Sequence, residues 1–317
     1  MNVGAVPIID LGPAAGGGLA GRMAVAREID AACRATGFFQ IVNHGVPPAQ
    51  CEAILESARA FFAMPMDAKL EVAMSRSPAN RGYEPLGGQT LEAGTAPDLK
   101  ESFYIGRDLD ETDPYVRKSV PNHGPNQWPA GLPGFRTALE DAHAELLWLG
   151  KRMMRLFALA LGMPECHFDR FVEAPMALLR LLHYPPLPAD GAPARLGAGA
   201  HTDWGALTLL LQDSVGGLEV RGPDDLWLPV PPVAGALVVN IGDMMQRWTN
   251  DRYRSTLHRV RNNDSGRDRY SAPMFIDLNF FARVECLPTC TSADEPPRYA
   301  PCTAGEHIAE MYRRTYG

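Results

Sequence analysis

The sequence predicts an α+β fold, in which a closed or double-sheet β structure such as a jelly roll is braced by N-terminal and central helices. Two patterns predict this fold. Apolar residues recur at helical spacing in the first half, whereas short β-type runs alternate with turn signals from residue 177 onwards. Many short strands at such spacing are typical of sandwiches and barrels. With 46% hydrophobic residues, the chain of 317 residues can bury such a core without a disulfide or a structural metal.

Residues 1–165 are expected to form a mainly helical zone with short strands. The regular elements predicted at its start are a strand at 6–10, a helix at 19–36, a strand at 37–42 and a helix at 47–62. In the first of these helices, Ala26, Ile29 and Cys33 recur at the spacing of one helix face. This pattern predicts helices that pack one apolar side against the β structure.

The region from 75 to 135 is rich in glycine and proline and has little periodicity. A long irregular stretch is therefore expected there, and in a compact domain such a stretch is usually functional or mobile. Two long helices are expected to follow near 134–162. They should end at Gly162, because the Gly-Met-Pro sequence that begins there stops a helix.

The β structure is expected at 177–280, and a terminal helix at 300–317. The eight predicted strands lie at 177–184, 196–203, 206–212, 217–221, 226–230, 236–240, 255–262 and 268–278. We find no internal repeat and no interdomain linker. The sequence therefore predicts a single domain over 1–317, in which the N-terminal helices brace the β structure.

Charge and composition exclude several classes of partner. The net charge of −7 and the lack of a basic arm argue against nucleic acid. No apolar run is long enough to span a bilayer, and the N-terminus lacks the order of a signal peptide. The six cysteines do not form a disulfide framework, and reduced thiols in a cytoplasmic protein are the simplest interpretation. The sequence leaves the oligomeric state open.

Three residues form a candidate metal site. His201 and Asp203 are two residues apart in a predicted strand, so their side chains can point to one centre. His258, from a different predicted strand, supplies a third ligand. Two imidazoles and one carboxylate on one face of a metal are typical of non-haem Fe(II) oxygenases, which keep coordination positions open for substrates. A zinc hydrolase site is the alternative at this point.

A carboxylate-binding pair follows the metal site in the sequence. If the turn signal at 262–266 joins adjacent antiparallel strands, His258 lies opposite Ser271, and Arg269 shares the same face. A planar guanidinium and a hydroxyl would then bind a carboxylate close to the metal. This arrangement depends on the register, because a slip by one residue would turn both side chains away.

Several segments along nearly the whole chain carry recognisable motifs. They are Pro7-Ile-Ile-Asp-Leu11, Gly37-Phe-Phe-Gln-Ile-Val-Asn-His-Gly-Val46, Leu179-Arg-Leu-Leu-His-Tyr-Pro-Pro186, Val239-Asn-Ile-Gly-Asp243, Thr249-Asn250 and Ser255-x-x-His-Arg-Val260. Together they resemble the isopenicillin N synthase-like branch of the Fe(II)/2-oxoglutarate-dependent dioxygenases. The resemblance implies a double-stranded β-helix that binds Fe(II) through the two histidines and the aspartate named above.

The resemblance also implies how the cosubstrate binds. Arg269 and Ser271 would bind the distal carboxylate of 2-oxoglutarate, and Tyr184 would help to bind this cosubstrate. The chain departs from many relatives at Leu182, where they have asparagine. The implied activity is hydroxylation or desaturation of a small molecule with O2.

Two other functions stay open. In some relatives the Arg-x-Ser pair binds the carboxylate of the main substrate, which makes a 2-oxoglutarate-independent Fe(II) oxidase or an ethylene-forming type the first alternative. The second is a non-catalytic ligand sensor on the same scaffold. The intact set of three metal ligands argues against a sensor.

Further side chains are weaker candidates for the site. For Asn240, Asp243 and Arg259 we favour a structural role over one in orienting a metal ligand. Three aromatic residues are candidates for the pocket wall but are more often plain core, namely Trp204, Trp248 and Phe275. Three residues at 80–105 are candidates for contact with a polar substrate or are solvated loop residues, namely Arg81, Tyr83 and Lys100.

Overall fold

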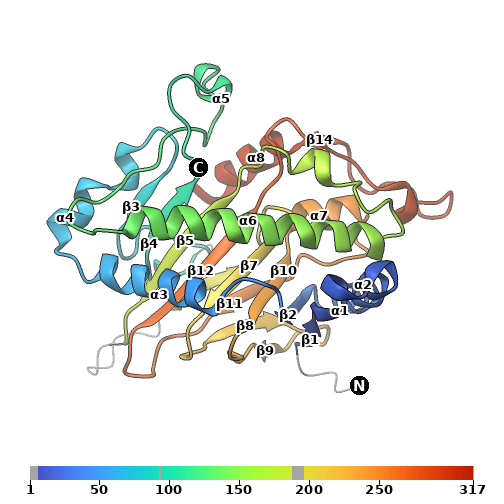
Figure 1. The fold of residues 1–317 in the computed structure, drawn as a ribbon, viewed down its shortest axis with the longest axis horizontal. Coiled ribbons are helices and arrows are strands. Elements are labelled where there is room, and N and C mark those ends of the chain that lie inside the picture. The colour runs from blue at the N-terminus through green and yellow to red at the C-terminus, as the bar shows by residue number, and fades with distance from the viewer. Residues whose placement is uncertain (1–5, 93, 188–195, 317) are drawn as a thin grey trace.

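A computed structural model describes residues 6–92, 94–187 and 196–316. Within them, the strands form a large sheet, a smaller one and a two-stranded ribbon (Figure 1). The large sheet contains, in spatial order, β1 (Ile8–Asp10), β2 (Phe38–Val42), β10 (Leu237–Ile241), β7 (Leu207–Gln212), β12 (Arg269–Ile276), β5 (Leu178–Tyr184), β4 (Glu101–Gly106) and β3 (Gly82–Glu84). The smaller sheet contains β6 (Ala198–His201), β11 (His258–Val260), β8 (Leu218–Arg221) and β9 (Trp227–Pro229). The ribbon pairs β13 (Arg283–Val284) with β14 (Cys302–Thr303).

Helices α2 (Gly18–Ala35), α3 (Pro48–Phe62) and α6 (Phe135–Ala160) contact the large sheet. The other helices are α1 (Gly12–Gly16), α4 (Met66–Glu71), α5 (Pro114–Arg117), α7 (Asp243–Trp248) and α8 (Ala304–Tyr316), with 3-10 turns at Met74–Arg76, Asp169–Phe171 and Pro288–Cys290. The long helix α6 runs across the sheet and contacts β7, β12, α2 and α3 (Figure 1). Its apolar face is buried because it packs on this sheet.

The described residues form two apolar cores, one on each face of the large sheet. The larger core lies between the sheet and the helices, and it includes Ala272, Met274 and Ile276 of β12. The smaller core lies between the two sheets, and Leu182 and Tyr184 of β5 belong to it. Because side chains alternate along a strand, Arg269 and Ser271 face the second sheet, as Leu182 and Tyr184 do. The space between the two sheets is therefore where polar side chains can face a ligand.

The α+β fold and the eight predicted strands of the second half are confirmed, since β5 to β12 overlap all eight ranges. Two other predictions are wrong. One 26-residue helix, α6, replaces the two helices expected near 134–162. Residues 75–135 are not simply irregular, because β3 and β4 join the large sheet. The pattern hid β4, because Glu101 and Ser102 are polar residues that are nevertheless buried.

The predicted domain organisation stays a prediction. Four strands from the zone at 1–165 belong to the same large sheet as strands from the β structure at 177–280. Residues 1–5, 93, 188–195 and 317 lie outside the described residues. Among the described residues, no helix is both long and apolar enough to cross a membrane.

Gly37 lies between the end of α2 and the start of β2. Its φ of +70° is in the left-handed region that a residue at this position after a helix commonly adopts, and its N–H donates to Ala32 O at 3.1 Å. A Cβ at this position would lie 2.1 Å from the carbonyl oxygen of Arg254. Only glycine fits here, because both the backbone conformation and the close approach of another segment exclude a side chain.

We expect Gly37→Ala to lower the free energy of unfolding by about 2–4 kcal/mol, because the strained φ and the clash add up. Urea denaturation measures this change. Gly16→Ala is the matched control, since nothing lies within 4 Å of a Cβ at that helical position. Equal stability of the two variants would contradict this account of Gly37.

Candidate active site

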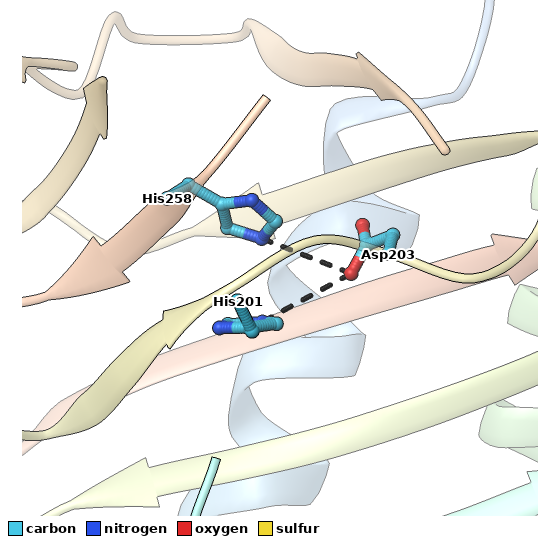
Figure 2. Close-up of side chains that lie close together, drawn as sticks. All are labelled: His201, Asp203 and His258. Atoms are coloured by element: carbon cyan, nitrogen blue, oxygen red, sulfur yellow. Dashed lines mark ion pairs between the residues drawn. The ribbon is translucent and has the colours of Figure 1, made fainter. Parts of the chain in front are cut away.

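The three predicted metal ligands meet between the two sheets. His201 ends β6, Asp203 follows in the next loop, and His258 begins β11 directly opposite His201. The Nε2 atoms of His201 and His258 lie 4.0 and 3.7 Å from Asp203 Oδ1. Figure 2 shows both rings turned towards this oxygen. The three ligand atoms lie within 4.8 Å of one another, and no other such group of histidine, cysteine or acidic residues occurs among the described residues.

Backbone carbonyls orient both imidazoles. The Nδ1 atom of His201 lies 2.8 Å from Gly199 O, and Nδ1 of His258 lies 3.1 Å from Thr256 O. A carbonyl oxygen can only accept, so each ring carries its proton on Nδ1 and directs the lone pair of Nε2 to the centre. Burial, together with the neighbouring His258, also holds the pKa of His201 well below its usual range. A neutral imidazole with a free Nε2 is the form that binds a metal.

Two donors hold the carboxylate of Asp203 from behind. Asn240 Nδ2 and Thr208 Oγ1 donate to Asp203 Oδ2 at 2.6 and 2.5 Å, which leaves Oδ1 to face the imidazoles. Burial raises the pKa of Asp203, but the two histidines and these two hydrogen bonds outweigh it, so the pKa is lowered and the carboxylate stays ionised. The preference for a purely structural role is therefore wrong for Asn240, which fixes a candidate ligand.

The other two candidates of this kind have the structural roles that we expected. Arg259 points to the opposite face of β11 and pairs with Glu219 at 2.8 Å. Asp243 begins α7, and its backbone N–H donates to Asp203 O at 2.8 Å. This bond ties the start of α7 to the loop that carries Asp203.

The predicted carboxylate-binding residues line an inner cavity of about 60 Å³ that reaches His201, Asp203 and His258. Arg269 lies directly opposite Tyr184 in the pairing of β12 with β5, and its guanidinium stands 4.6 Å from the centre of the Tyr184 ring. Arg269 Nη1 is 3.4 Å from Ser271 Oγ. All three of these side chains are buried.

The predicted pairing of His258 with Ser271 is wrong. His258 pairs with His201 and Val220 in the smaller sheet, whereas Ser271 pairs with Leu182 and Gln212 in the large sheet. The turn signal at 262–266 therefore connects two sheets and does not form a hairpin. The side chains still meet, because the inner faces of the two sheets are opposed.

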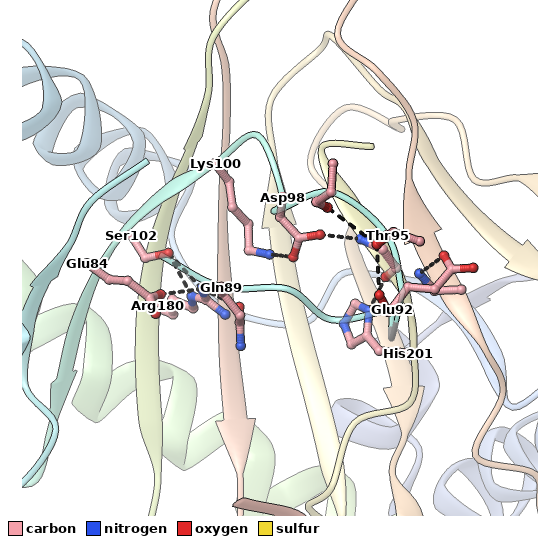
Figure 3. Close-up of polar contacts among 12 residues, drawn as sticks. Glu84, Gln89, Glu92, Thr95, Asp98, Lys100, Ser102, Arg180 and His201 are labelled. Atoms are coloured by element: carbon pink, nitrogen blue, oxygen red, sulfur yellow. Dashed lines mark hydrogen bonds and ion pairs between the residues drawn. The ribbon is translucent and has the colours of Figure 1, made fainter. Parts of the chain in front are cut away.

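A strap formed by residues 89–92 and 94–100 covers the outer edge of β6 (Figure 3). Asp98 Oδ1 accepts from Gly199 N at 2.9 Å, and Glu92 Oε2 accepts from Ala200 N at 3.1 Å. The edge strand that ends at His201 thus has its free N–H groups bonded by side chains instead of a further strand. Lys100 lies within the inner cavity wall and pairs with Asp98.

An outer cavity of about 130 Å³ adjoins the inner one. Both have His201, Asp203, Arg180, Phe275 and Leu91 in their walls, so the two cavities meet at the candidate metal site. The outer walls also contain Arg81, Trp204, Asp277, Ile308 and Tyr312. Trp204 contacts Tyr312 of α8 edge-on at 5.2 Å, so the C-terminal helix closes one side of this cavity.

The weaker candidates differ in whether they line a cavity. Trp204 and Phe275 line the outer cavity, whereas Trp248 belongs to the core. Arg81 and Lys100 are buried in cavity walls and are not solvated loop charges. Tyr83 is also buried, but it donates to Glu101 at 2.6 Å and lines neither cavity.

Among the wall residues missed in the sequence, two carried a signal that alternation along a strand provides. Arg180 alternates with Leu182 and Tyr184 on β5, and Asp277 continues the alternation of Ser271 and Phe275 past the end of β12. Arg180 donates to Glu84 at 3.0 Å and to Ser102 at 2.7 Å (Figure 3). Extending the period of two along both strands would have found them.

Comparisons with known proteins agree with this geometry. Residues 175–278 match the model of the 2OG-Fe(II) oxygenase superfamily, and residues 6–131 match the N-terminal model described as "non-haem dioxygenase in morphine synthesis". The 2-oxoglutarate-Fe(II) type oxidoreductase hxnY of Emericella nidulans is 43% identical over 99% of this chain and 91% of that protein. The chain belongs to the 2OG-Fe(II) oxygenase superfamily.

Solved structures place the whole chain in this superfamily. A full-length Neurospora crassa protein in complex with alpha-KG matches 100% of this chain and 98% of its own, with a TM-score of 0.89 and 31% identity. JOX2 in complex with 2OG, Fe and JA matches 98% of this chain and 85% of its own, with a TM-score of 0.78 and 32% identity. The predicted double-stranded β-helix is confirmed, and the protein is an oxygenase that uses Fe(II) and 2-oxoglutarate on a small-molecule substrate.

We expect Asp98→Leu to lower the free energy of unfolding of the metal-free protein by about 3–5 kcal/mol, because Lys100 is then a buried cation without its partner. Burial and the charge of Arg180 already lower the pKa of Lys100 to about 8. Folding such a lysine releases protons, so the loss should be smaller near pH 9 than near pH 7. Urea denaturation at the two pH values measures both effects.

The double variant Asp98→Leu/Lys100→Met is the control. It removes both charges, and it should recover a large part of the stability that the single variant loses. A double variant as unstable as the single one would show that the bond from Gly199 to Asp98, and not the ion pair, carries the effect.

Proposed function

We propose that His201, Asp203 and His258 hold the Fe(II) of this oxygenase. The observation that supports this most directly is the convergence of two Nε2 atoms and one carboxylate oxygen on a single centre. The donor set fits ferrous iron, because two neutral imidazoles and one carboxylate on one side leave positions open on the other. The bound iron, with 2-oxoglutarate and O2, supplies the oxidation of a substrate C–H bond.

We infer that Arg269 and Ser271 bind the distal carboxylate of 2-oxoglutarate, with Tyr184 in the wall beside them. Arg269 is only 2% exposed, and among the described residues no carboxylate pairs with it. A buried guanidinium without an anion is costly, and a dicarboxylate ligand removes that cost. Arg269 Nε donates to Gly216 O, which fixes the guanidinium so that its outer N–H groups can face the ligand.

The protein residues position the reactants and exclude water. The walls of the inner cavity are mostly apolar, and they include Leu182, Leu210, Leu218 and Val260. Leu182 stands on this wall where many relatives have asparagine, so the cosubstrate has one polar contact fewer there. A dry cavity strengthens the attraction between Arg269 and a carboxylate.

The substrate is proposed to enter the outer cavity, which meets the inner one at His201 and Asp203. The Neurospora crassa relative has also been solved with alpha-KG and thymine together, and that structure matches this chain with a TM-score of 0.88. This supports a small organic molecule as the substrate, with hydroxylation or desaturation as the reaction. We propose no nucleic-acid partner, since the net charge is −7, and a cytoplasmic location, since all six cysteines are free.

We expect Arg269→Leu to raise the dissociation constant for 2-oxoglutarate by about 10- to 100-fold, because a charge-assisted bond to a carboxylate is lost. Anaerobic titration of the Fe(II)-loaded protein, followed by the visible charge-transfer band of the chelate, measures the affinity. Arg259→Leu is the matched control, since this arginine lies on the other face of its strand. An unchanged affinity in Arg269→Leu would remove that residue from its assigned role.

We expect turnover to form about one succinate for each O2 consumed, because the cosubstrate supplies two of the electrons that reduce O2. His258→Ala should bind no iron and form no succinate, and metal analysis after anaerobic purification tests the first point. Oxygen consumption without succinate would favour a 2-oxoglutarate-independent oxidase. Ligand binding without any oxygen consumption would favour a sensor.

A further inference from the structure

A buried carboxyl group faces the outer cavity without a partner. Asp277 follows the last residue of β12 and is 8% exposed. Among the described residues, no donor or cation contacts its carboxyl group. Its Oδ1 lies against the backbone of Gly205, where a Cβ would be 1.9 Å away. The carboxyl group is thus held beside the loop that carries Asp203.

This arrangement is unfavourable for folding alone. Burial, together with the charge of Asp203, raises the pKa of Asp277 to about 7, so the group is partly neutral at neutral pH. Even a neutral carboxyl group loses hydrogen bonds to water when it is buried, and no hydrogen bond among the described residues replaces them. Strained or unpaired polar groups of this kind are typical of sites that bind a ligand.

A buried cation stands in the wall of the same cavity. Arg81 is 3% exposed, and two of its nitrogens donate to Ala79 O at 2.7 Å and to Asn122 O at 2.9 Å. Its third nitrogen, Nε, is buried and has no hydrogen-bond partner among the described residues. Although burial lowers the pKa of Arg81 to about 10, the guanidinium remains charged at neutral pH.

The size and the walls of the cavity restrict what can bind. Its volume of about 130 Å³ is close to that of a cavity that holds one benzene ring. Aromatic rings of Trp204 and Phe275 line it, and Tyr312 and Ile308 of α8 add further apolar surface. Flat apolar walls favour a planar ring over a chain of the same volume.

We propose that this cavity binds a single planar ring with a hydrogen-bond donor for Asp277 and a carbonyl or anionic acceptor for Arg81. Lactam- and imide-type heterocycles carry both groups on one ring. The inference rests on the proposed function, because the cavity must open onto the iron. Asp277 and Arg81 are then the residues that determine specificity. A pocket with unpaired polar groups rejects an analogue that cannot satisfy them.

Asp277 has the stronger effect on selectivity, because it lies beside the loop that carries Asp203. A ring N–H or hydroxyl bonded to Asp277 is held close to the metal site, so the neighbouring C–H bonds are presented for oxidation. Arg81 stands between two loops and anchors the ring at another point. An acceptor at Asp277 and a donor at Arg81 orient an asymmetric ring in one direction.

The test is calorimetric titration of the anaerobic protein loaded with Fe(II) and 2-oxoglutarate. The two probes are thymine and 2-pyridone, and each is compared with its fully N-methylated derivative, 1,3-dimethylthymine and N-methyl-2-pyridone. Methylation removes the N–H donors and keeps the ring. We expect the N–H forms to bind on the order of tenfold more tightly than the N-methyl forms. In Asp277→Leu this ratio should fall to within about threefold, since no acceptor remains.

Two variants distinguish a lost ligand contact from a loss of folding. Asp277→Leu should fold and bind 2-oxoglutarate normally, because a leucine of similar size replaces a buried carboxyl group that has no hydrogen-bond partner among the described residues. Arg81→Gln keeps donors for the two carbonyls and should weaken both N–H probes, and its thermal melting temperature shows whether it folds.

Several results would overturn the inference: no binding of either N–H probe, equal affinity for methylated and unmethylated probes, or an unchanged ratio in Asp277→Leu. If the unmodified Fe(II)-loaded protein did not bind 2-oxoglutarate, the proposed function would be overturned instead.

Discussion

The antiparallel pairing of β6 with β11 sets His201 directly opposite His258, and the rest of the site is arranged around this pair. β6 is an edge strand, so it needs support from outside the sheet. The strap at 89–92 and 94–100 gives this support through the side chains of Asp98 and Glu92. Asn240 and Thr208 hold the carboxylate of Asp203, which completes the group of metal ligands. Separate parts of the chain therefore fix the positions of the three candidate metal ligands.

The buried charges fall into two groups with different consequences. The first group is paired within the protein, as Lys69 is with Glu101 and Lys100 with Asp98, and such pairs hold segments together. The second group consists of Arg269 and Arg81, which have no ion-pair partner among the described residues and which line the two cavities. The carboxyl group of Asp277 also lines the outer cavity without a partner, and burial with the nearby charge of Asp203 raises its pKa to about 7. Buried polar groups without partners are costly in a folded protein, so their concentration around the cavities indicates where ligands compensate them.

Much of the fold and the centre of the site could be predicted from the sequence. The eight strands of the second half could be found because each is a short β-type run bounded by turn residues, and both signals are local in the sequence. β4 could not be found, because Glu101 and Ser102 are buried by partners more than 15 residues away, namely Lys69, Tyr83 and Arg180. The same holds for the hydrogen bond from Asn240 to Asp203, which joins residues 37 positions apart.

The order His-x-Asp, His and Arg-x-Ser already indicates which residue types are available for the metal and the cosubstrate, because folding does not change these types. How these residues meet depends on the packing of the two sheets. The pairing of His258 with Ser271 that the turn suggested does not exist, yet Arg269 and His258 face the same cavity, because two sheets pack with their inner faces opposed. This difference arises because strand register depends on local alternation, whereas the choice of partner strand depends on which apolar faces the whole chain can bury together.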